Sequence, residues 1–246
     1  MHTNLCTIDF LLCEYHTKFM KNRSILTWGG ILYILASLQY LAAQVIAASA
    51  WHPSYNWNAN YISDLGNTTC GNFALPHEMP SYICSPDYML MNMSFILIGI
   101  LLFVGTILLK DYWPNGKLAK TGFVLLLIAS IGKSLVGLVP ENTILSLHTA
   151  AALNIPLGSI AILFLSIQIL HKHKALAIIG FATFILGICA TVLLIIMEYK
   201  EIASLAGLGY GGMERVAGYP MNIWMIIVGA LAIREGRKHS SKNSIG

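Results

Sequence analysis

ALAIIGFATFILGICATVLLIIM, residues 175–197, is the stretch that decides the fold. It runs for 23 residues without a charged side chain. The hydrocarbon core of a bilayer needs roughly 20 consecutive, mostly apolar residues in an α-helix. A helix also pairs its own backbone polar groups, as a segment in lipid must. The stretch therefore predicts a membrane-spanning helix.

Five more apolar stretches lie on either side of it, and Lys133 is the one charged residue within any of the six. Over the whole chain of 246 residues, 56% are hydrophobic and only 11% are charged, against about 25% in a typical soluble domain. These proportions exclude a soluble globular enzyme and a disordered chain. They predict an all-α fold, a polytopic six-helix membrane bundle with one long extracytoplasmic loop. The predicted spans are Ile25–Ala50, Tyr88–Leu109, Thr121–Val139, His148–Leu170, Ala175–Met197 and Val216–Ile233.

The charges are sorted along the chain. With six spans, twelve lysines and arginines fall on the side that carries both termini, and only Lys200 and Arg215 fall on the other. Basic flanks stay in the cytoplasm, so we expect a cell-membrane protein with both termini cytoplasmic. The net charge of +4 is then a consequence of topology, and no nucleic acid is expected as a partner.

We divide the chain into a cytoplasmic N-terminal extension (1–19), a six-helix membrane domain (20–238) and a cytoplasmic tail (239–246). The apolar run after Met20 is longer than the apolar region of a signal peptide, which favours an uncleaved first helix. Two interpretations of residues 1–19 stay open. They form an amphipathic cytoplasmic segment, or they are an upstream extension of a chain that starts at Met20.

The largest polar interval, residues 51–87, is rich in Pro, Asn, Ser and Gly and predicts ordered turns. Cys70 and Cys84 both lie in it, on the side of the membrane where disulfides persist. We expect them to form a disulfide. Asn67-Thr68-Thr69 also matches the acceptor pattern for N-glycosylation, a pattern that is common by chance.

Polar side chains suited to chemistry gather at the predicted outer boundary. Such a group of acids, histidines and arginine could serve general acid–base catalysis, bind a lipid headgroup or simply form a polar, solvent-exposed surface. Asp64, Glu141 and His148 are the candidate catalytic residues. The candidates for a headgroup contact or a structural ion pair are Arg215, Glu214, Lys133 and His52.

Asp64 and Arg215 make the most specific pair. Asp64 sits just before Gly66 in a turn-like sequence, and arginine binds a carboxylate through two parallel hydrogen bonds. We expect Arg215 to tie the first loop to the last helix through Asp64.

Lys133 lies seven residues before Pro140, so about 10 Å inside the third span by helical rise. A charge inside the membrane by default marks a site with a partner. The alternative is that its ammonium reaches the boundary along its own aliphatic chain.

Pro156, deep in the fourth span, is expected to kink that helix and free a backbone carbonyl. The sequence contains no phosphate-binding loop, dinucleotide fingerprint, zinc-protease motif or paired CxxC motif. We therefore predict no cofactor and no metal.

Several of these residues belong to short motifs that follow one another along the chain. In order, the motifs are His52-Pro53, residues 60–66 (NYISDLG), residues 137–141 (GLVPE), His148 and residues 212–216 (GMERV). This order, within residues 21–238, resembles the "domain of unknown function 998" family of six-helix membrane proteins from archaea and bacteria. The ISDLG stretch is also remotely similar to the damage-regulated autophagy modulator and FRAG-type families. The first resemblance implies the fold, and the second implies by analogy a role with membrane lipids.

Two functions compete on this basis, and a third, a transporter or channel, rests only on Lys133 and Pro156. The first is a site at the outer leaflet that binds or remodels a lipid. The second is an accessory or structural subunit of a larger membrane complex, whose partners would be other membrane proteins. The chain's small residues, such as Gly99, Gly105, Gly180 and Gly187, suit close helix packing within or between chains.

Overall fold

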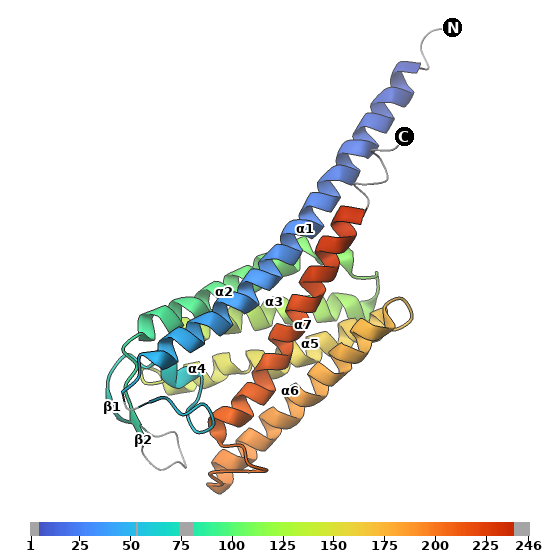
Figure 1. The fold of residues 1–246 in the computed structure, drawn as a ribbon. Coiled ribbons are helices and arrows are strands. Elements are labelled where there is room, and N and C mark those ends of the chain that lie inside the picture. The colour runs from blue at the N-terminus through green and yellow to red at the C-terminus, as the bar shows by residue number, and fades with distance from the viewer. Residues whose placement is uncertain (1–4, 53, 74–80, 239–246) are drawn as a thin grey trace.

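The computed structural model describes residues 5–52, 54–73 and 81–238, with side chains described between residues 24 and 237 of those ranges. Almost all of the regular structure is helical (Figure 1). The elements in chain order are α1 (Leu5–Ser49), η1 (Ser63–Gly66), β1 (Gly71–Phe73), β2 (Ser81–Ile83), α2 (Tyr88–Leu108), η2 (Lys110–Tyr112), α3 (Lys117–Leu138), α4 (Leu145–Ala152), α5 (Asn154–Ile169), α6 (Lys174–Lys200) and α7 (Tyr210–Lys238).

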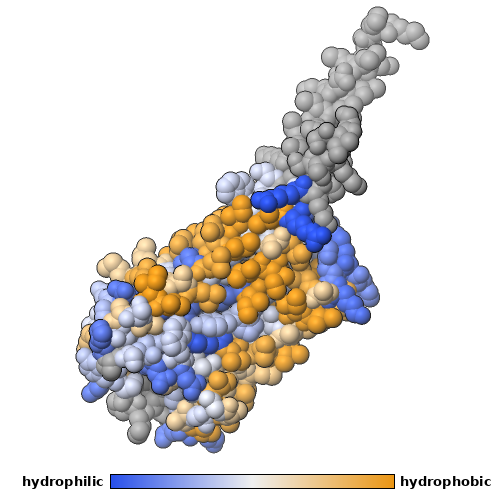
Figure 2. Space-filling model, viewed as in Figure 1, coloured by the Kyte–Doolittle hydropathy of each residue, from blue (hydrophilic) through white to orange (hydrophobic). Residues whose placement is uncertain are grey.

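Six segments of the described chain are long and apolar enough to cross a membrane, which confirms the predicted all-α bundle of six spans. They are Ser24–Ser49, Tyr88–Leu108, Lys117–Leu138, Leu145–Ile169, Lys174–Lys200 and Tyr210–Arg237. Hydrophobic side chains dominate the surface of the helical body, and hydrophilic ones gather near its two ends (Figure 2). The protein is thus a multi-pass membrane protein. That the membrane is the cell membrane and that the termini are cytoplasmic stay predictions.

The helices pack as a ring. α1 contacts α2 and α7, α2 contacts α3, α3 contacts α5, and α6 closes the ring between α5 and α7. We call the end of the ring that holds residues 54–73, 81–87, 139–144 and 201–209 the loop end. The opposite end, where α1 enters and α7 leaves, is the terminal end (Figure 1).

Glycines set the spacing between several of these helices. α1 and α7 touch through Gly30 and Gly229, where a Cβ on either residue would collide with the other's carbonyl oxygen. The four glycines that the sequence singled out also face neighbours within the chain: Gly99 faces α3, Gly105 faces Tyr33 of α1, and Gly180 and Gly187 face serines of α5. These small residues serve packing inside this chain, because close backbone approach leaves no room for a side chain.

The fourth span is broken at Leu153 into α4 and α5, as expected from Pro156, which has no N–H to offer the carbonyl of Ala152. One boundary differs from the prediction for an identifiable reason. α7 begins at Tyr210 rather than at Val216. Backbone carbonyls of the first loop accept hydrogen bonds from its opening N–H groups, Gly211 to Ala59 (3.2 Å) and Gly212 to Asn58 (2.9 Å), so a distant segment caps this helix.

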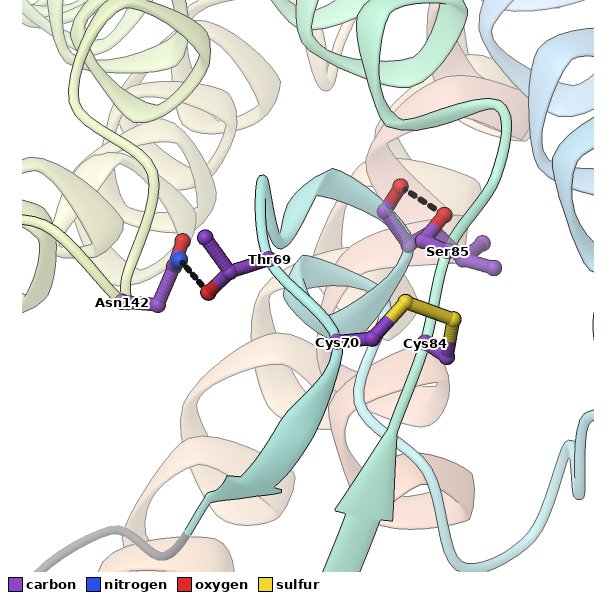
Figure 3. The surroundings of a disulfide bond; sticks show 6 residues. Thr69, Cys70, Cys84, Ser85 and Asn142 are labelled. Carbon is purple, nitrogen blue, oxygen red and sulfur yellow. Dashed lines mark hydrogen bonds between the residues drawn. A yellow bond between two sulfur atoms is a disulfide. The ribbon is translucent and has the colours of Figure 1, made fainter.

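The long loop is ordered by a short antiparallel hairpin. β1 pairs with β2, with Gly71 opposite Ile83 and Phe73 opposite Ser81. Cys70 and Cys84 flank the hairpin and form the predicted disulfide (Figure 3). Asn142 of the next loop donates hydrogen bonds to the Thr68 and Thr69 hydroxyls, both at 3.0 Å.

Asn67, the acceptor in the glycosylation pattern, is 2% exposed. An oligosaccharide could not be attached there in the folded chain. The pattern is therefore a chance match.

The disulfide closes a loop with a sequence separation of 14 residues. We expect replacement of both Cys70 and Cys84 by serine to lower the free energy of unfolding by about 2–3 kcal/mol, because the unfolded chain regains loop entropy. Thermal unfolding in mild detergent measures this. The matched control is Cys189→Ser, which removes the free, exposed cysteine of α6. Equal melting temperatures for the double variant and the wild type would contradict the expectation.

Candidate functional site

The candidate site lies at the loop end, where residues 54–67 meet the start of α7. η1 begins just after Tyr61, and the Asp64 carboxylate accepts hydrogen bonds from the Tyr61 N–H (2.9 Å) and the Asn60 side chain (3.2 Å). Asp64 itself is 3% exposed. Its first role is local, because its carboxylate fixes the turn that enters η1.

Arg215 fastens this loop to α7. Its guanidinium donates hydrogen bonds to the carbonyl oxygens of Trp57 and Asn60, both at 2.9 Å, and to Gly211 of its own helix at 2.8 Å. It also hydrogen-bonds the Tyr55 hydroxyl and lies over the rings of Tyr55 (5.4 Å) and Trp57 (4.9 Å). Arg215 thus ties the first loop to the last helix.

The partners of Arg215 differ from the one we expected. The hydrogen bonds of its guanidinium go to backbone carbonyls and tyrosine hydroxyls, Tyr219 included, while Asp64 is bound by its own loop. The loop carbonyls and tyrosines satisfy the two terminal nitrogens of the guanidinium, while its buried Nε has no hydrogen-bond partner among the described residues. Arg215 is therefore committed to the fold.

Two further contacts hold the loop from the neighbouring helices. The Ile62 N–H donates to the Glu214 carboxylate of α7 at 2.5 Å. The Tyr61 hydroxyl donates to Glu198 of α6 at 2.9 Å, and its ring stacks on Tyr210 with centroids 5.8 Å apart. Glu214 is half-buried, and its carboxylate is held against the loop by the hydrogen bond from Ile62.

Asp64 and Glu141 form a buried carboxyl pair. Glu141 is 2% exposed, and its side chain is hydrogen-bonded to Asp64 and to Ser63. Burial raises the pKa of Asp64, and burial together with the charge of Asp64 raises the pKa of Glu141 well above its usual range. Two ionised carboxylates cannot hydrogen-bond each other, so this contact requires a proton on one of the two. The Oε1 atom of Glu141 is buried and receives no hydrogen bond from an N–H or hydroxyl donor among the described residues.

Lys133 belongs to the same cluster. It is 6% exposed on α3, its ammonium lies 4.9 Å from the centre of the Tyr40 ring, and it interacts electrostatically with Glu214. The Lys133 side chain therefore does not extend to the membrane boundary. Lys133 and Arg215 place positive charge beside the acids, which lowers the cost of burying the cluster.

The two histidines lie differently. The Nδ1 atom of His148 is 2.7 Å from the Val139 carbonyl oxygen, a bond that joins α4 to the end of α3. His52 is exposed. Of the seven candidates, the structure brings together Asp64, Glu141, Glu214, Arg215 and Lys133. Within the described ranges, no group of three or more His, Cys, Asp or Glu side chains is arranged to hold a metal ion.

Three tyrosines that lie around Arg215 and Glu214 were not predicted from the sequence. Tyr40 interacts electrostatically with both of these charged residues, Tyr55 binds Arg215, and the Tyr219 hydroxyl donates to Gln44 at 2.8 Å. Tyrosines in apolar helices are common, and no spacing in the sequence links Tyr40 of α1 to Tyr219 of α7. Only the packing of α1 on α7 could have revealed them.

Fold and site together define a class: a multi-pass membrane protein with a buried, hydrogen-bonded charge cluster at one end of its bundle. The comparison with protein families adds a finding. A family model described as "Protein of unknown function (DUF998)" matches residues 34–231. The match covers most of the chain, and the protein belongs to this family. Searches of curated proteins and of solved structures gave no match.

Replacement of Arg215 by lysine tests its role in fixing the loop. A lysine keeps the charge but cannot donate in the planar fork, so buried carbonyls lose partners. We expect the free energy of unfolding to fall by about 2–4 kcal/mol and proteolysis within residues 54–62 to accelerate. Arg234→Lys, on the exposed part of the same helix, is the matched control. Equal effects of the two substitutions would show that Arg215 holds nothing in place.

The carboxyl pair predicts the direction of a pH effect. Both carboxyls have raised pKa values in the folded protein, against 3.8 and 4.5 for the unperturbed groups. The folded chain thus keeps a proton that the unfolded chain releases, and stability falls as the pH rises from the unperturbed values through the raised ones.

Melting temperatures measured across this pH range check the effect. Glu141→Gln carries no proton to release, so we expect it to flatten the slope. Glu201→Gln, an exposed acid at the same end, should leave the slope unchanged. A wild-type stability that rises through this range would contradict the shared proton.

Proposed function

We propose that the loop-end cluster binds the polar headgroup of a membrane lipid and that Asp64 and Glu141 supply acid–base chemistry to it. The observation that carries the proposal is the buried carboxyl pair, in which the Oε1 atom of Glu141 receives no hydrogen bond from an N–H or hydroxyl donor among the described residues. A buried acceptor without such a donor is costly and is a feature that a bound ligand would explain.

The division of roles within the cluster supports a headgroup of particular chemistry. Arg215 is occupied by the loop, which leaves Lys133 as the base that can meet a phosphate. The Oε1 atom of Glu141 receives no hydrogen bond from an N–H or hydroxyl donor among the described residues, and the half-buried Glu214 interacts electrostatically with Glu141. A zwitterionic headgroup fits this set, with its ammonium on the carboxylates and its phosphate on Lys133.

The carboxyl pair adds a chemical capacity to binding. One member is protonated and the other ionised, so the pair can donate a proton and accept one in the same site. Hydrolysis or transfer at an ester needs both steps. Such chemistry would make the protein a lipid-remodelling enzyme rather than a passive lipid-binding protein.

A second candidate function is favoured by a different observation. The loop is fixed to α6 and α7 by hydrogen bonds of Arg215, Glu214 and Tyr61. A rigid loop end without chemistry of its own would suit an accessory or structural subunit of a membrane complex. The partners would then be other membrane proteins.

Purification in mild detergent, followed by mass spectrometry of bound lipids and proteins, separates the two candidates. For the lipid site, we expect the wild type to carry about one zwitterionic lipid per chain. Glu141→Gln and Lys133→Gln should each reduce this occupancy about tenfold or more, since a hydrogen bond to a charged group is worth roughly 1.5–3 kcal/mol. Glu201→Gln is again the control.

The same measurement can overturn the proposal. Equal lipid complements in the wild type and in Glu141→Gln would exclude the cluster as the binding site. A protein partner at one copy per chain, with no bound lipid, would favour the accessory subunit.

A further inference from the structure

A hollow lies at the terminal end, far from the carboxyl pair. It has a volume of about 500 Å³ and is formed by η2, the turn that follows it and the first two turns of α3. The family match assigns this hollow no role, and no residue of the loop-end cluster lines it.

The wall of this hollow changes character along the membrane axis. Lys110 and Lys120 are exposed in its wall, whereas Ala119 is buried and Phe123 is half-buried. α3 runs from Lys117 into the membrane, so Phe123 lies about 4–5 Å deeper than Lys120 by helical rise. Ammonium groups outside and apolar side chains inside are the order in which a phospholipid presents its phosphate and its acyl chains.

Trp113 supplies a rigid wall and an unsatisfied donor. It is 6% exposed, and its ring stacks on Trp224 of α7 with centroids 5.6 Å apart. Its indole N–H has no hydrogen-bond partner among the described residues, although indole N–H groups in proteins are usually paired. Gly116, which precedes α3, gives the helix no side-chain cap, so its first N–H groups are also available to an anion.

We infer that this hollow binds the phosphate of an anionic phospholipid in the leaflet at the terminal end. Lys110 and Lys120 neutralise the phosphate, and Trp113 and Phe123 contact the start of the acyl chains. Asp111 also lines the hollow, so the site keeps one net positive charge and fits one phosphodiester rather than a multiply charged group.

A neighbouring feature supplies the matched control. Arg234 and Arg237 line a more open hollow of about 440 Å³ on α7, at the same end of the bundle. Loss of these two arginines removes the same charge from the same leaflet, and it leaves Lys110, Lys120 and Trp113 in place.

The test uses the full chain in zwitterionic nanodiscs or mild detergent, with phosphatidylglycerol titrated and binding read by native mass spectrometry. We expect one phosphatidylglycerol per wild-type chain. Lys110→Gln combined with Lys120→Gln should weaken binding about tenfold or more, and Arg234→Gln combined with Arg237→Gln less than about threefold. Trp113→Phe, which keeps the ring and removes the donor, should weaken binding several-fold without changing the helical content.

Three results would overturn the inference. Equal losses in the two double variants would mean that general positive charge attracts the lipid. Full displacement of the lipid by an equal concentration of inorganic phosphate would identify a site for a soluble anion. Unchanged binding in the lysine double variant would place the lipid elsewhere.

Discussion

The structure depends on one constraint at the loop end: polar groups buried at the edge of the membrane must find partners inside the protein. Residues 54–67 turn backbone carbonyls toward α7, and Arg215 donates to two of them. Conversely, the N–H of Ile62 in the loop donates a hydrogen bond to the Glu214 carboxylate of α7. A carbonyl or N–H left unpaired there would cost about 1–3 kcal/mol. This exchange fixes the loop and sets the point at which α7 begins.

The acids of the cluster meet the same constraint in a different way. Asp64 and Glu141 are both almost fully buried and share a hydrogen bond that requires a proton. Lys133 and Arg215 place positive charge beside the acids. Opposite charges within the cluster lower the cost of burying it.

Much of the fold could be predicted because lipid imposes a simple rule. Apolar length located the six spans, and charge within an apolar run singled out Lys133. The cysteine positions on one predicted side of the membrane gave the disulfide. The start of α7 was not predicted, because it depends on tertiary contacts. Its first N–H groups bind the carbonyls of Ala59 and Asn58, which lie some 150 residues away in the sequence.

The candidate site was predictable only in part, for a related reason. Side-chain chemistry identified Asp64, Glu141 and Arg215 as members, but backbone carbonyls are the same at every residue and leave no mark in a sequence. The predicted carboxylate partner of Arg215 was therefore wrong. His148 was included because histidine suits acid–base chemistry, yet its ring joins two helices through Val139.

The shared proton of Asp64 and Glu141 is the central claim, and infrared spectroscopy of the purified protein tests it most directly. A protonated carboxylic acid has a carbonyl stretch that an ionised carboxylate lacks. At neutral pH we expect this band to be stronger in the wild type than in Glu141→Gln, and Glu201→Gln to match the wild type. A wild-type spectrum without the band, or a band of equal strength in Glu141→Gln, would contradict the shared proton.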